Sequence, residues 1–291
     1  MVGSTESGLT RAMTTDTHPG QLTLVLGSSG TTGRRVVERL AERGVPTRHG
    51  SRSAEPPFDW ADETTWPSVL ENVTAAYIVY YPDLVAPGAL DRVRRFAELA
   101  VAGGVRRLVL LSGRGEELAQ AAEQAVRDSG ADATIVRCAF FAQNFSEKGF
   151  EEFVRSGTVA LPAPVVGEPF VHADDIADVV VAALTEDGHA GQVYELTGPR
   201  LLTFEESVAE IAKATGRDID YQRISAEEFI AGLTAQGIPE EEAEVFAEIF
   251  GTVLDGRNSH LTDGVQRALG RPPRDFAQYT QEAAATGVWD S

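Results

Sequence analysis

Three glycines at a spacing of three residues, Gly27, Gly30 and Gly33, constrain the fold of this chain more than any other feature. They lie between the apolar, β-branched segment Gln21–Leu26, which predicts a buried strand, and Arg34–Arg43, whose apolar positions follow a helical period. In this context the first glycine permits a tight turn, the second lets a phosphate approach the backbone, and the third lets helix and strand pack closely. The spacing therefore predicts a dinucleotide-binding turn, with an ordinary glycine-rich turn as the alternative.

The start of the following helix belongs to the same predicted site. The amide groups of Thr31 and Thr32 lie at its N-terminus, where backbone N–H groups and the helix dipole attract an anion. We therefore expect a pyrophosphate to be held by the residues of this turn, which are Gly27, Ser28, Ser29, Gly30, Thr31, Thr32 and Gly33.

Strand and helix patterns alternate along the first half of the chain. The expected strands are Gln21–Leu26, Pro46–Gly50, Pro56–Trp60, Ala75–Val79, Arg107–Leu111 and Ala133–Arg137. The expected helices between them are Arg34–Arg43, Glu63–Leu70, Gly88–Val101 and Glu116–Asp128. This alternation predicts an α/β fold of Rossmann type, with a doubly wound parallel sheet and helices on both faces.

After Cys138 the alternation gives way to a mostly helical pattern. The expected elements are helices over Asn144–Arg155, Asp174–Thr185, Thr203–Thr215, Ala226–Gln236, Pro239–Leu254 and Thr262–Leu269, and a strand over Val193–Leu196. We interpret residues 21–291 as a single NAD(P)-binding domain with a helical C-terminal substrate cap, mainly from 140–170 and 198–291. Residues 1–20 are polar and aperiodic and are predicted to be a disordered lead.

The amino-acid composition limits the kinds of partner that the chain is expected to bind. The formal net charge is -19, from 44 acidic and 25 basic residues, so nucleic acid and anionic membrane surfaces are not expected partners. No apolar run approaches the ~20 residues of a membrane helix. Cys138 is the single cysteine, which excludes an intramolecular disulfide and favours a reducing, cytoplasmic location. A small molecule is the expected partner, and the oligomeric state is left open.

The loop after the second predicted strand indicates which cofactor binds. NAD sites usually carry a carboxylate here for the ribose hydroxyls. None occurs between Gly44 and Ala54, where Arg52 is flanked instead by Ser51 and Ser53. A guanidinium between two hydroxyls suits a 2′-phosphate. The sequence therefore predicts NADPH, and a solvated loop arginine is the alternative.

Hydroxyl groups end two further strands at the same edge of the predicted sheet. Tyr80, Tyr81 and Pro82 follow the fourth expected strand, and Ser112 ends the fifth. We expect Tyr80, Pro82 and Ser112 beside the nicotinamide half of the cofactor. Tyr81, Ser112 and Tyr80 are the candidate catalytic residues, although a packing role explains each tyrosine equally well.

One common mechanism of this fold is excluded by residue spacing. Many reductases use a Tyr-x-x-x-Lys pair, in which the lysine lowers the pKa of the tyrosine that protonates the product. The two lysines, Lys148 and Lys213, have Asn144 and Ala209 at the tyrosine position. The histidines and Cys138 show no metal-ligand spacing, so no metal site is predicted.

Several segments carry a family resemblance. LVLGSSGTTGRRVVERL, AYIVYYPD, RRLVLLSG, ATIVRCAFFAQNF and FVHADDIADVVVAALTE resemble the NmrA-like branch of the atypical short-chain dehydrogenases/reductases. FDWADETTW, GPRLLTFEESVAEI and DGRNSH are similar to segments of the fungal festuclavine and agroclavine dehydrogenases. The resemblance runs from about Leu22 to Ala283.

The resemblance implies further site residues. It puts Asp59 and Trp60 near the adenine, and Ala139, Phe140 and Phe141 on the far side of the nicotinamide. The clavine enzymes reduce an iminium carbon with NADPH. Because an iminium already carries a positive charge, that reaction needs no protonation of oxygen and no Tyr/Lys pair.

These observations predict an NADPH-dependent oxidoreductase. Its expected reaction is hydride transfer to a small, largely apolar electrophile, such as an imine or iminium, enone, quinone or carbonyl compound, within secondary metabolism. The alternative is a non-catalytic, NADPH-sensing NmrA-like regulatory protein. The missing acid–base pair is compatible with both functions, whereas turnover of any substrate distinguishes them.

Overall fold

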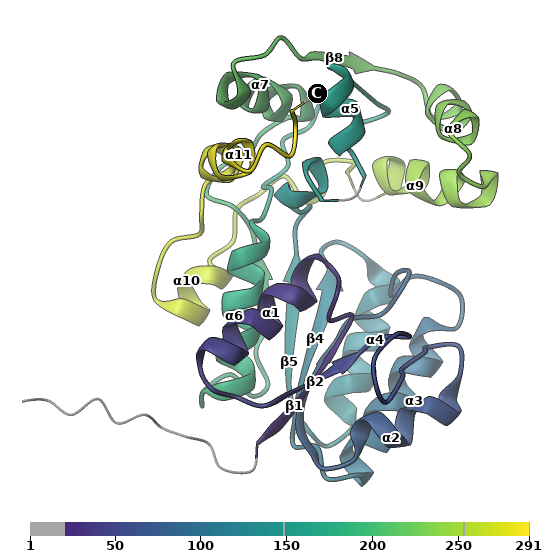
Figure 1. Ribbon diagram of the computed structural model, residues 1–291, viewed down its shortest axis with the longest axis vertical. Helices are drawn as coiled ribbons and strands as arrows, with labels where there is room; N and C mark the ends of the chain where they lie inside the picture. Colours follow the sequence, from purple (N-terminus) through teal and green to yellow (C-terminus); the bar gives the residue numbers. More distant parts are fainter. Residues whose placement is uncertain (1–20, 148, 253, 291) are drawn as a thin grey trace, which may run out of the picture.

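The computed structural model of this chain describes residues 21–290 except Lys148 and Val253. The predicted disordered lead, residues 1–20, lies outside the described residues. Figure 1 shows two stacked parts: a sheet flanked by helices, and a mainly helical part above the sheet's upper edge.

The first part is built on a six-stranded sheet in the order β2-β1-β3-β4-β5-β7. Each neighbouring pair is parallel, so all six carboxyl ends lie at one edge. This confirms the predicted α/β fold with a doubly wound parallel sheet. The strands are β1 (Leu22–Leu26), β2 (Thr47–Gly50), β3 (Val73–Ile78), β4 (Arg107–Gly113), β5 (Asp132–Cys138) and β7 (Val193–Leu196).

Helices cover both faces of this sheet because both faces of its strands are apolar. Ile78 and Leu110 belong to the core cluster on one face, and their neighbours Tyr77 and Val109 belong to the cluster on the other. The first cluster also takes residues from α2 (Trp66–Leu70), α3 (Ala89–Ala102) and α4 (Glu117–Asp128). The second takes residues from α1 (Thr31–Glu42), α6 (Ala173–Thr185) and α10 (Gly264–Leu269).

The expected strand Pro56–Trp60 is wrong. The segment makes a single isolated bridge, between Asp59 and Asp62, after a short turn. Two consecutive prolines cannot donate to a strand ladder, so the segment instead inserts Phe58 into the core. The strand before Tyr80 is therefore the third of the sheet, and Ser112 lies in the fourth. The 3₁₀ helix η1 (Glu63–Thr65) leads from this segment into α2.

The expected helix Asn144–Arg155 is interrupted. A 3₁₀ turn, η2 (Ala142–Phe145), is separated from α5 (Glu151–Ser156) by Gly149, whose φ of 120° is incompatible with a helix. The break lets Phe145 and Phe150 pack edge to face with ring centroids 5.5 Å apart.

The second part, which we call the cap, has a core of its own. Phenylalanines are its main component: the Phe170 and Phe204 rings lie 5.2 Å apart, and Phe250 packs 5.7 Å from Phe204. Its two-stranded sheet and its last helix were not predicted from the sequence. The cap comprises α5, β6 (Thr158–Leu161), α7 (Phe204–Thr215), β8 (Asp220–Arg223), α8 (Ala226–Ala235), α9 (Glu240–Thr252) and α11 (Phe276–Ala285).

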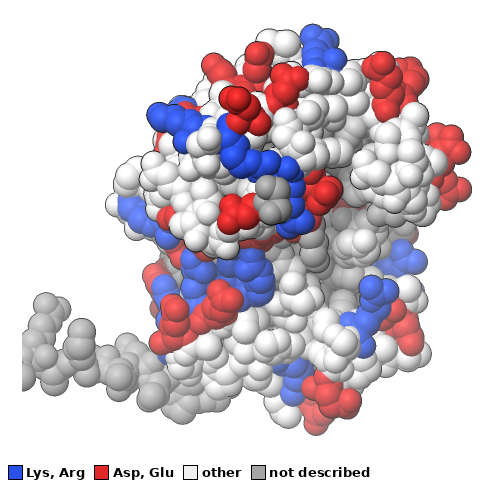
Figure 2. All heavy atoms as spheres, turned by 45° about the horizontal axis from the view of Figure 1, so that its top comes forward, with Lys and Arg blue, Asp and Glu red and all other residues white. Residues whose placement is uncertain are grey.

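Charges of both signs are mixed over the visible surface in Figure 2, although acidic residues are in excess. Within residues 21–290, as far as they are described, no helix is long and apolar enough to cross a membrane.

Candidate active site

The glycine turn joins β1 to α1 and packs most closely at Gly33. Gly27 has a φ of +64°, in the left-handed region that favours glycine. A Cβ at Gly33 would lie 2.1 Å from the Gly27 carbonyl oxygen, and one at Gly30 would lie 3.2 Å from it. The α1 N-terminus begins at Thr31, where the first-turn amides have no partner within the helix. This cradle fits a phosphate group held by backbone N–H groups.

An open hollow of about 580 Å³ runs along β2 from its first residue, Thr47, to the loop after it, beside the glycine turn. Ser28 and Ser29 line it from the glycine turn, and Ser51 and Ser53 line it from the loop after β2. Arg52 is exposed on that loop. The neighbouring Arg48 is engaged elsewhere, since its Nη1 donates to the Glu71 carbonyl oxygen at 2.6 Å.

The two residues expected near the adenine are held by packing. Trp60 donates its indole N–H to the Val79 carbonyl oxygen at 3.0 Å, and its ring centroid lies 4.8 Å from that of Tyr80. The Asp59 carboxylate accepts the Ala61 amide at 2.9 Å. Both residues follow the loop after β2, on the side of the sheet covered by α3.

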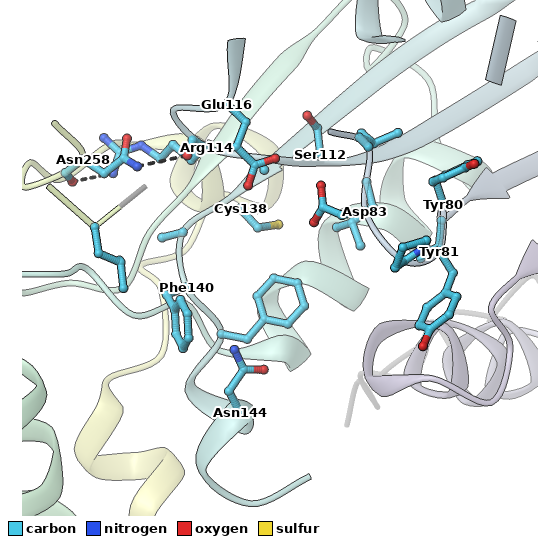
Figure 3. A pocket seen from close by; sticks show the side chains of 18 of the residues that line it. Tyr80, Tyr81, Asp83, Ser112, Arg114, Glu116, Cys138, Phe140, Asn144 and Asn258 are labelled. Atoms are coloured by element: carbon cyan, nitrogen blue, oxygen red, sulfur yellow. Dashed lines mark hydrogen bonds between the residues drawn. The ribbon is translucent and has the colours of Figure 1, made fainter. Parts of the chain in front are cut away.

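A cavity of about 340 Å³ opens at the carboxyl ends of β3, β4 and β5. A Cβ at Gly27 would lie 3.4 Å from Cβ of Val79, which lines this cavity, so the glycine turn and the cavity are adjacent. Figure 3 shows its side chains. They come from Val79–Leu84, Leu111–Arg114, Glu116, Cys138–Phe141, Asn144, Glu168, Leu254 and Asn258.

One side of the cavity is apolar and aromatic. Phe140 and Phe141 follow β5, and Leu254 comes from the segment after α9. Phe140 stacks on Phe150 with ring planes 6° apart, which fixes its orientation. The structure thus brings Ala139–Phe141 to the same cavity as Pro82 and Ser112.

The three candidate catalytic hydroxyls are directed elsewhere. Ser112 is buried and donates its hydroxyl to Oε1 of Glu123 at 2.7 Å. Tyr80 is buried, and its hydroxyl accepts Nη1 of Arg92 at 3.0 Å. Tyr81 is 73% exposed. Figure 3 shows both tyrosine hydroxyls pointing away from the cavity centre.

The acceptor of the Ser112 proton belongs to a buried ion pair behind β4 and β5. Glu123, on α4, is fully buried and receives Nε and Nη2 of Arg137 at 2.7 and 2.6 Å. These hydrogen bonds raise the pKa of Arg137. The opposite end of the Arg137 guanidinium contacts Glu195 at 3.1 Å.

Carboxyl groups form the polar side of the cavity. Asp83 comes from the loop after β3 and Glu116 from the loop after β4, and their carboxyl groups face one another in Figure 3. Burial, together with the negative charges of Asp83 and Glu123, raises the pKa of Glu116 to about 7. Burial also raises the pKa of Asp83, against hydrogen bonds from two backbone amides.

A third carboxyl group, that of Glu168, is 3% exposed and accepts the Phe140 amide at 3.0 Å. Burial raises its pKa to about 7, although that amide and the charge of Arg114 act in the opposite direction. Neither Glu116 nor Glu168 was predicted from the sequence as a site residue. Glu116 carries a usable signal, since it follows the end of a parallel strand, whereas Glu168 is brought in by the cap.

The loop carrying Glu116 is fixed by a C-terminal segment. The Asn258 amide donates to the Arg114 carbonyl oxygen at 3.0 Å, and Nη1 of Arg114 donates to the Asn258 carbonyl oxygen at 2.9 Å. Asn258 belongs to the DGRNSH segment noted in the sequence. This reciprocal pair holds the loop after β4 against the segment after α9.

Outside this cavity, three residues lie close enough together to hold a metal ion. Ligand atoms of His172, Asp174 and Glu282 lie within 4.8 Å of one another. The first two already serve the start of α6: Nδ1 of His172 accepts the Asp174 amide at 3.1 Å, and Asp174 contacts Arg39 at 2.8 Å. Their other contacts explain the arrangement without an ion.

The family model for the NmrA-like family matches residues 120–273 of the chain. Agroclavine dehydrogenase from Claviceps fusiformis is 32% identical over 282 residues, covering 89% of this chain and 96% of its own length. NAD(P)H azoreductase from Xenophilus azovorans is 29% identical, with coverage of 90% and 98%.

Among solved structures, Citrobacter sp. triphenylmethane reductase complexed with NADP(H) has a TM-score of 0.71 at 20% identity. The match covers 90% of this chain and 99% of that one. This similarity extends to the sheet and the cap together and establishes the shared fold.

Proposed function

The chain belongs to the NmrA-like family, and from that premise we propose that it is an NADPH-dependent reductase of a small, largely apolar electrophile. The similar proteins reported above are a dehydrogenase and two reductases. The azoreductase is named for NAD(P)H, and the triphenylmethane reductase structure contains NADP(H). Hydride transfer is accordingly the reaction class assigned to the cavity.

One observation carries the proposal: the glycine cradle and the cavity are adjacent along the carboxyl edge of the sheet. Open α/β sheets bind ligands at this edge. A dinucleotide anchored by its pyrophosphate at Gly30 extends in two directions, toward the loop after β2 and toward the ends of β3–β5. The substrate then occupies the cavity between Phe140 and Asp83.

Residues of the chain fit both ends of NADPH. The amides at Thr31 and Thr32 would hold the pyrophosphate, and Arg52 with Ser51 and Ser53 would hold the 2′-phosphate. Asp59 and Trp60 would flank the adenine, and Pro82 and Ser112 the nicotinamide, with Ala139–Phe141 on its far side. When bound there, the cofactor supplies a hydride to an electrophilic carbon.

Among the candidate electrophiles, an imine or iminium fits best. Asp83, Glu116 and Glu168 surround the cavity with carboxyl groups, which stabilise a nearby cation. A ketone, enone or quinone develops negative charge on oxygen during reduction, and whichever of these groups is ionised opposes that charge. Phe140 and Phe141 provide the apolar contact for a flat substrate.

The test has two stages. Calorimetry should show NADPH binding more tightly than NADH, and NADPH consumption should then be followed with imines, N-alkyl iminium salts, quinones and enones. We expect consumption with imines or iminium salts. Tight NADPH binding with no turnover across the panel would instead favour the regulatory alternative.

A further inference from the structure

We propose that Glu116, paired with Asp83, is the proton donor of this cavity: it protonates the nitrogen of a bound imine, and the two carboxyl groups then hold the iminium for reduction. This inference rests on the proposed function, because it assumes an imine substrate and a hydride from NADPH. In other reductases the tyrosine of the Tyr-x-x-x-Lys pair is the acid. Here the acid is Glu116, on the loop after β4.

The first support is the position of the Glu116 carboxyl group. A Cβ at Gly113 would lie 2.3 Å from both of its oxygens, so the carboxyl group lies directly over a glycine at the end of β4. From there it faces Asp83 across the cavity. Absence of a side chain at Gly113 is what makes room for this conformation.

The second support is unused hydrogen-bonding capacity. Oε2 of Glu116 is buried and has no hydrogen-bond partner among the described residues. Nη2 of Arg114, on a side chain 3% exposed in the same wall, is also unpartnered among them. The Arg114 guanidinium is directed toward Asn258 and Glu195, so the Glu116 oxygen is the unpartnered atom that bears on the cavity. Buried polar atoms normally have partners, so this free acceptor supports a polar ligand there.

The third support is electrostatic. Glu116 is faced by Asp83 from the β3 side, Glu123 from α4, Cys138 from β5 and Glu168 from the cap, with Arg114 on its own loop. Two neighbouring carboxyl groups in a buried site cannot both ionise freely, so the Asp83–Glu116 pair retains one proton more readily than two isolated groups. A donor with a pKa of about 7 is matched to acid catalysis near neutral pH.

The three candidate hydroxyl donors are directed away from the cavity. The Ser112 proton goes to Glu123, and the Tyr80 hydroxyl points away from the cavity toward Arg92. The Tyr81 ring is 73% exposed and points away. Of these groups, the Asp83–Glu116 pair is the one that faces the cavity with an exchangeable proton.

Protonation of the imine precedes its reduction. The O–H bond of Glu116 breaks, and its proton forms an N–H bond with the imine lone pair, giving an iminium between two carboxylates. The iminium carbon then accepts the hydride, and the electron pair of the C=N π bond becomes the amine lone pair. The substrate is reduced by two electrons, NADPH is oxidised, and Glu116 regains its proton from water.

The decisive comparison uses two substrates with one variant. For a dihydroisoquinoline imine above the pKa of its conjugate acid, Glu116→Gln should lower kcat/KM by about 10²–10⁴-fold, as expected for loss of a general acid. For the N-methyl iminium salt, which needs no proton, the same variant should stay within about tenfold. Glu117→Gln, at the adjacent exposed position, should match the wild type with both substrates.

A positioning variant gives a second reading. Gly113→Ala should displace the flexible Glu116 carboxyl group at little cost in stability and reproduce the selective loss with the imine. Equal losses with both substrates, or no loss with either, would overturn the assignment of Glu116 as the acid. Turnover of quinones or enones alone would overturn the imine assignment.

A readout that needs no turnover separates this proposal from the proposed function. Infrared difference spectra of the cofactor-free protein should show protonated carboxyl absorption that disappears as pH rises through about 7. This absorption should be weaker in Glu116→Gln, where the contribution of Glu168 remains. If the wild type did not bind NADPH, the proposed function would be contradicted, but the infrared band of the protonated Glu116 would still be present. A band unchanged in Glu116→Gln would contradict the present inference even if NADPH binds.

Discussion

Gly30 is the residue at which one added side chain tests the phosphate cradle most directly. A Cβ there would lie 3.2 Å from the Gly27 carbonyl oxygen, so an aspartate fits with a small shift and directs a carboxylate to where a phosphate must approach. We expect Gly30→Asp to remain folded and to lose NADPH binding, through bulk and like charge. Calorimetry on a variant with an unchanged circular dichroism spectrum measures this.

Gly232→Asp is the matched control for that variant. A Cβ at Gly232, on α8, meets no atom within 4 Å, so the same substitution there should leave NADPH binding unchanged. Undiminished affinity in folded Gly30→Asp would remove the glycine turn from the site.

Arg52 is the residue that we propose to select NADPH over NADH. Arg52→Ala should weaken NADPH binding by about 1.5–3 kcal/mol, the range for a hydrogen bond to a charged group, and leave NADH binding nearly unchanged. Arg94→Ala, at an exposed position paired with Asp91, serves as the control. Equal weakening of both cofactors in Arg52→Ala would show that the guanidinium does not contact the 2′-phosphate.

The directions in which the site's side chains point could not be predicted from the sequence. The end of β4 was predictable as a site segment, yet Ser112 turns its hydroxyl to Glu123 because a buried carboxylate lies 2.7 Å away. Glu123 is eleven residues further along the chain, so no local pattern links the two. Glu116 faces the cavity only because Gly113 leaves space beneath it.

At the scale of elements, a buried ion pair between Glu123 and Arg137 links α4 to the sheet. Glu123→Gln would leave the Arg137 guanidinium facing an amide and dependent on Glu195 alone. Removing one partner of a buried pair typically costs about 3–5 kcal/mol, so we expect a loss of unfolding free energy of that order. Urea denaturation measures it.

The exposed Glu117→Gln on the same helix is the control for this variant and should unfold close to the wild type. A Glu123→Gln loss no larger than that of the control would mean that packing, rather than the ion pair, holds α4 in place.

Elements with strong periodicity were predictable, and elements defined by distant contacts were not. Continuous apolar runs identify β1, β3, β4 and β5 because these strands are buried on both faces. The strand β8 has the sequence DYQR and pairs with β6 from 62 residues earlier, Thr158 opposite Asp220, so it carries little apolar signal. The segment Pro56–Trp60 looked apolar enough for a strand, but its prolines remove the ladder donors.

At the scale of the whole molecule, carboxyl groups respond to pH in two opposite ways. At the α1–α6 interface, burial acts to raise the pKa of Asp178, but hydrogen bonds and charge from Arg39 and Arg274 outweigh it and lower the pKa. Such a group stabilises the fold above its unfolded pKa of ~3.9, and that stability is lost as pH falls through its folded pKa. The carboxyl groups in the cavity have raised pKa values, so their contribution to stability is instead lost as pH rises.

Glu168 lets this reverse response be measured in one variant. Its folded pKa of about 7 exceeds its ordinary value, so the folded state holds the proton longer and stability falls as pH rises from ~4.3 to about 7. Glu168→Gln keeps an acceptor for the Phe140 amide and has no charge to bury. At pH values of about 4.3 the variant should therefore have the same unfolding free energy as the wild type. At pH values above about 7 its unfolding free energy should be higher than that of the wild type by on the order of 3 kcal/mol. Urea midpoints across that pH range test the difference, with Glu117→Gln as the exposed control. A stability difference that stays constant with pH would show that Glu168 is already ionised in the folded protein, and that the cavity wall is more polar than its burial indicates.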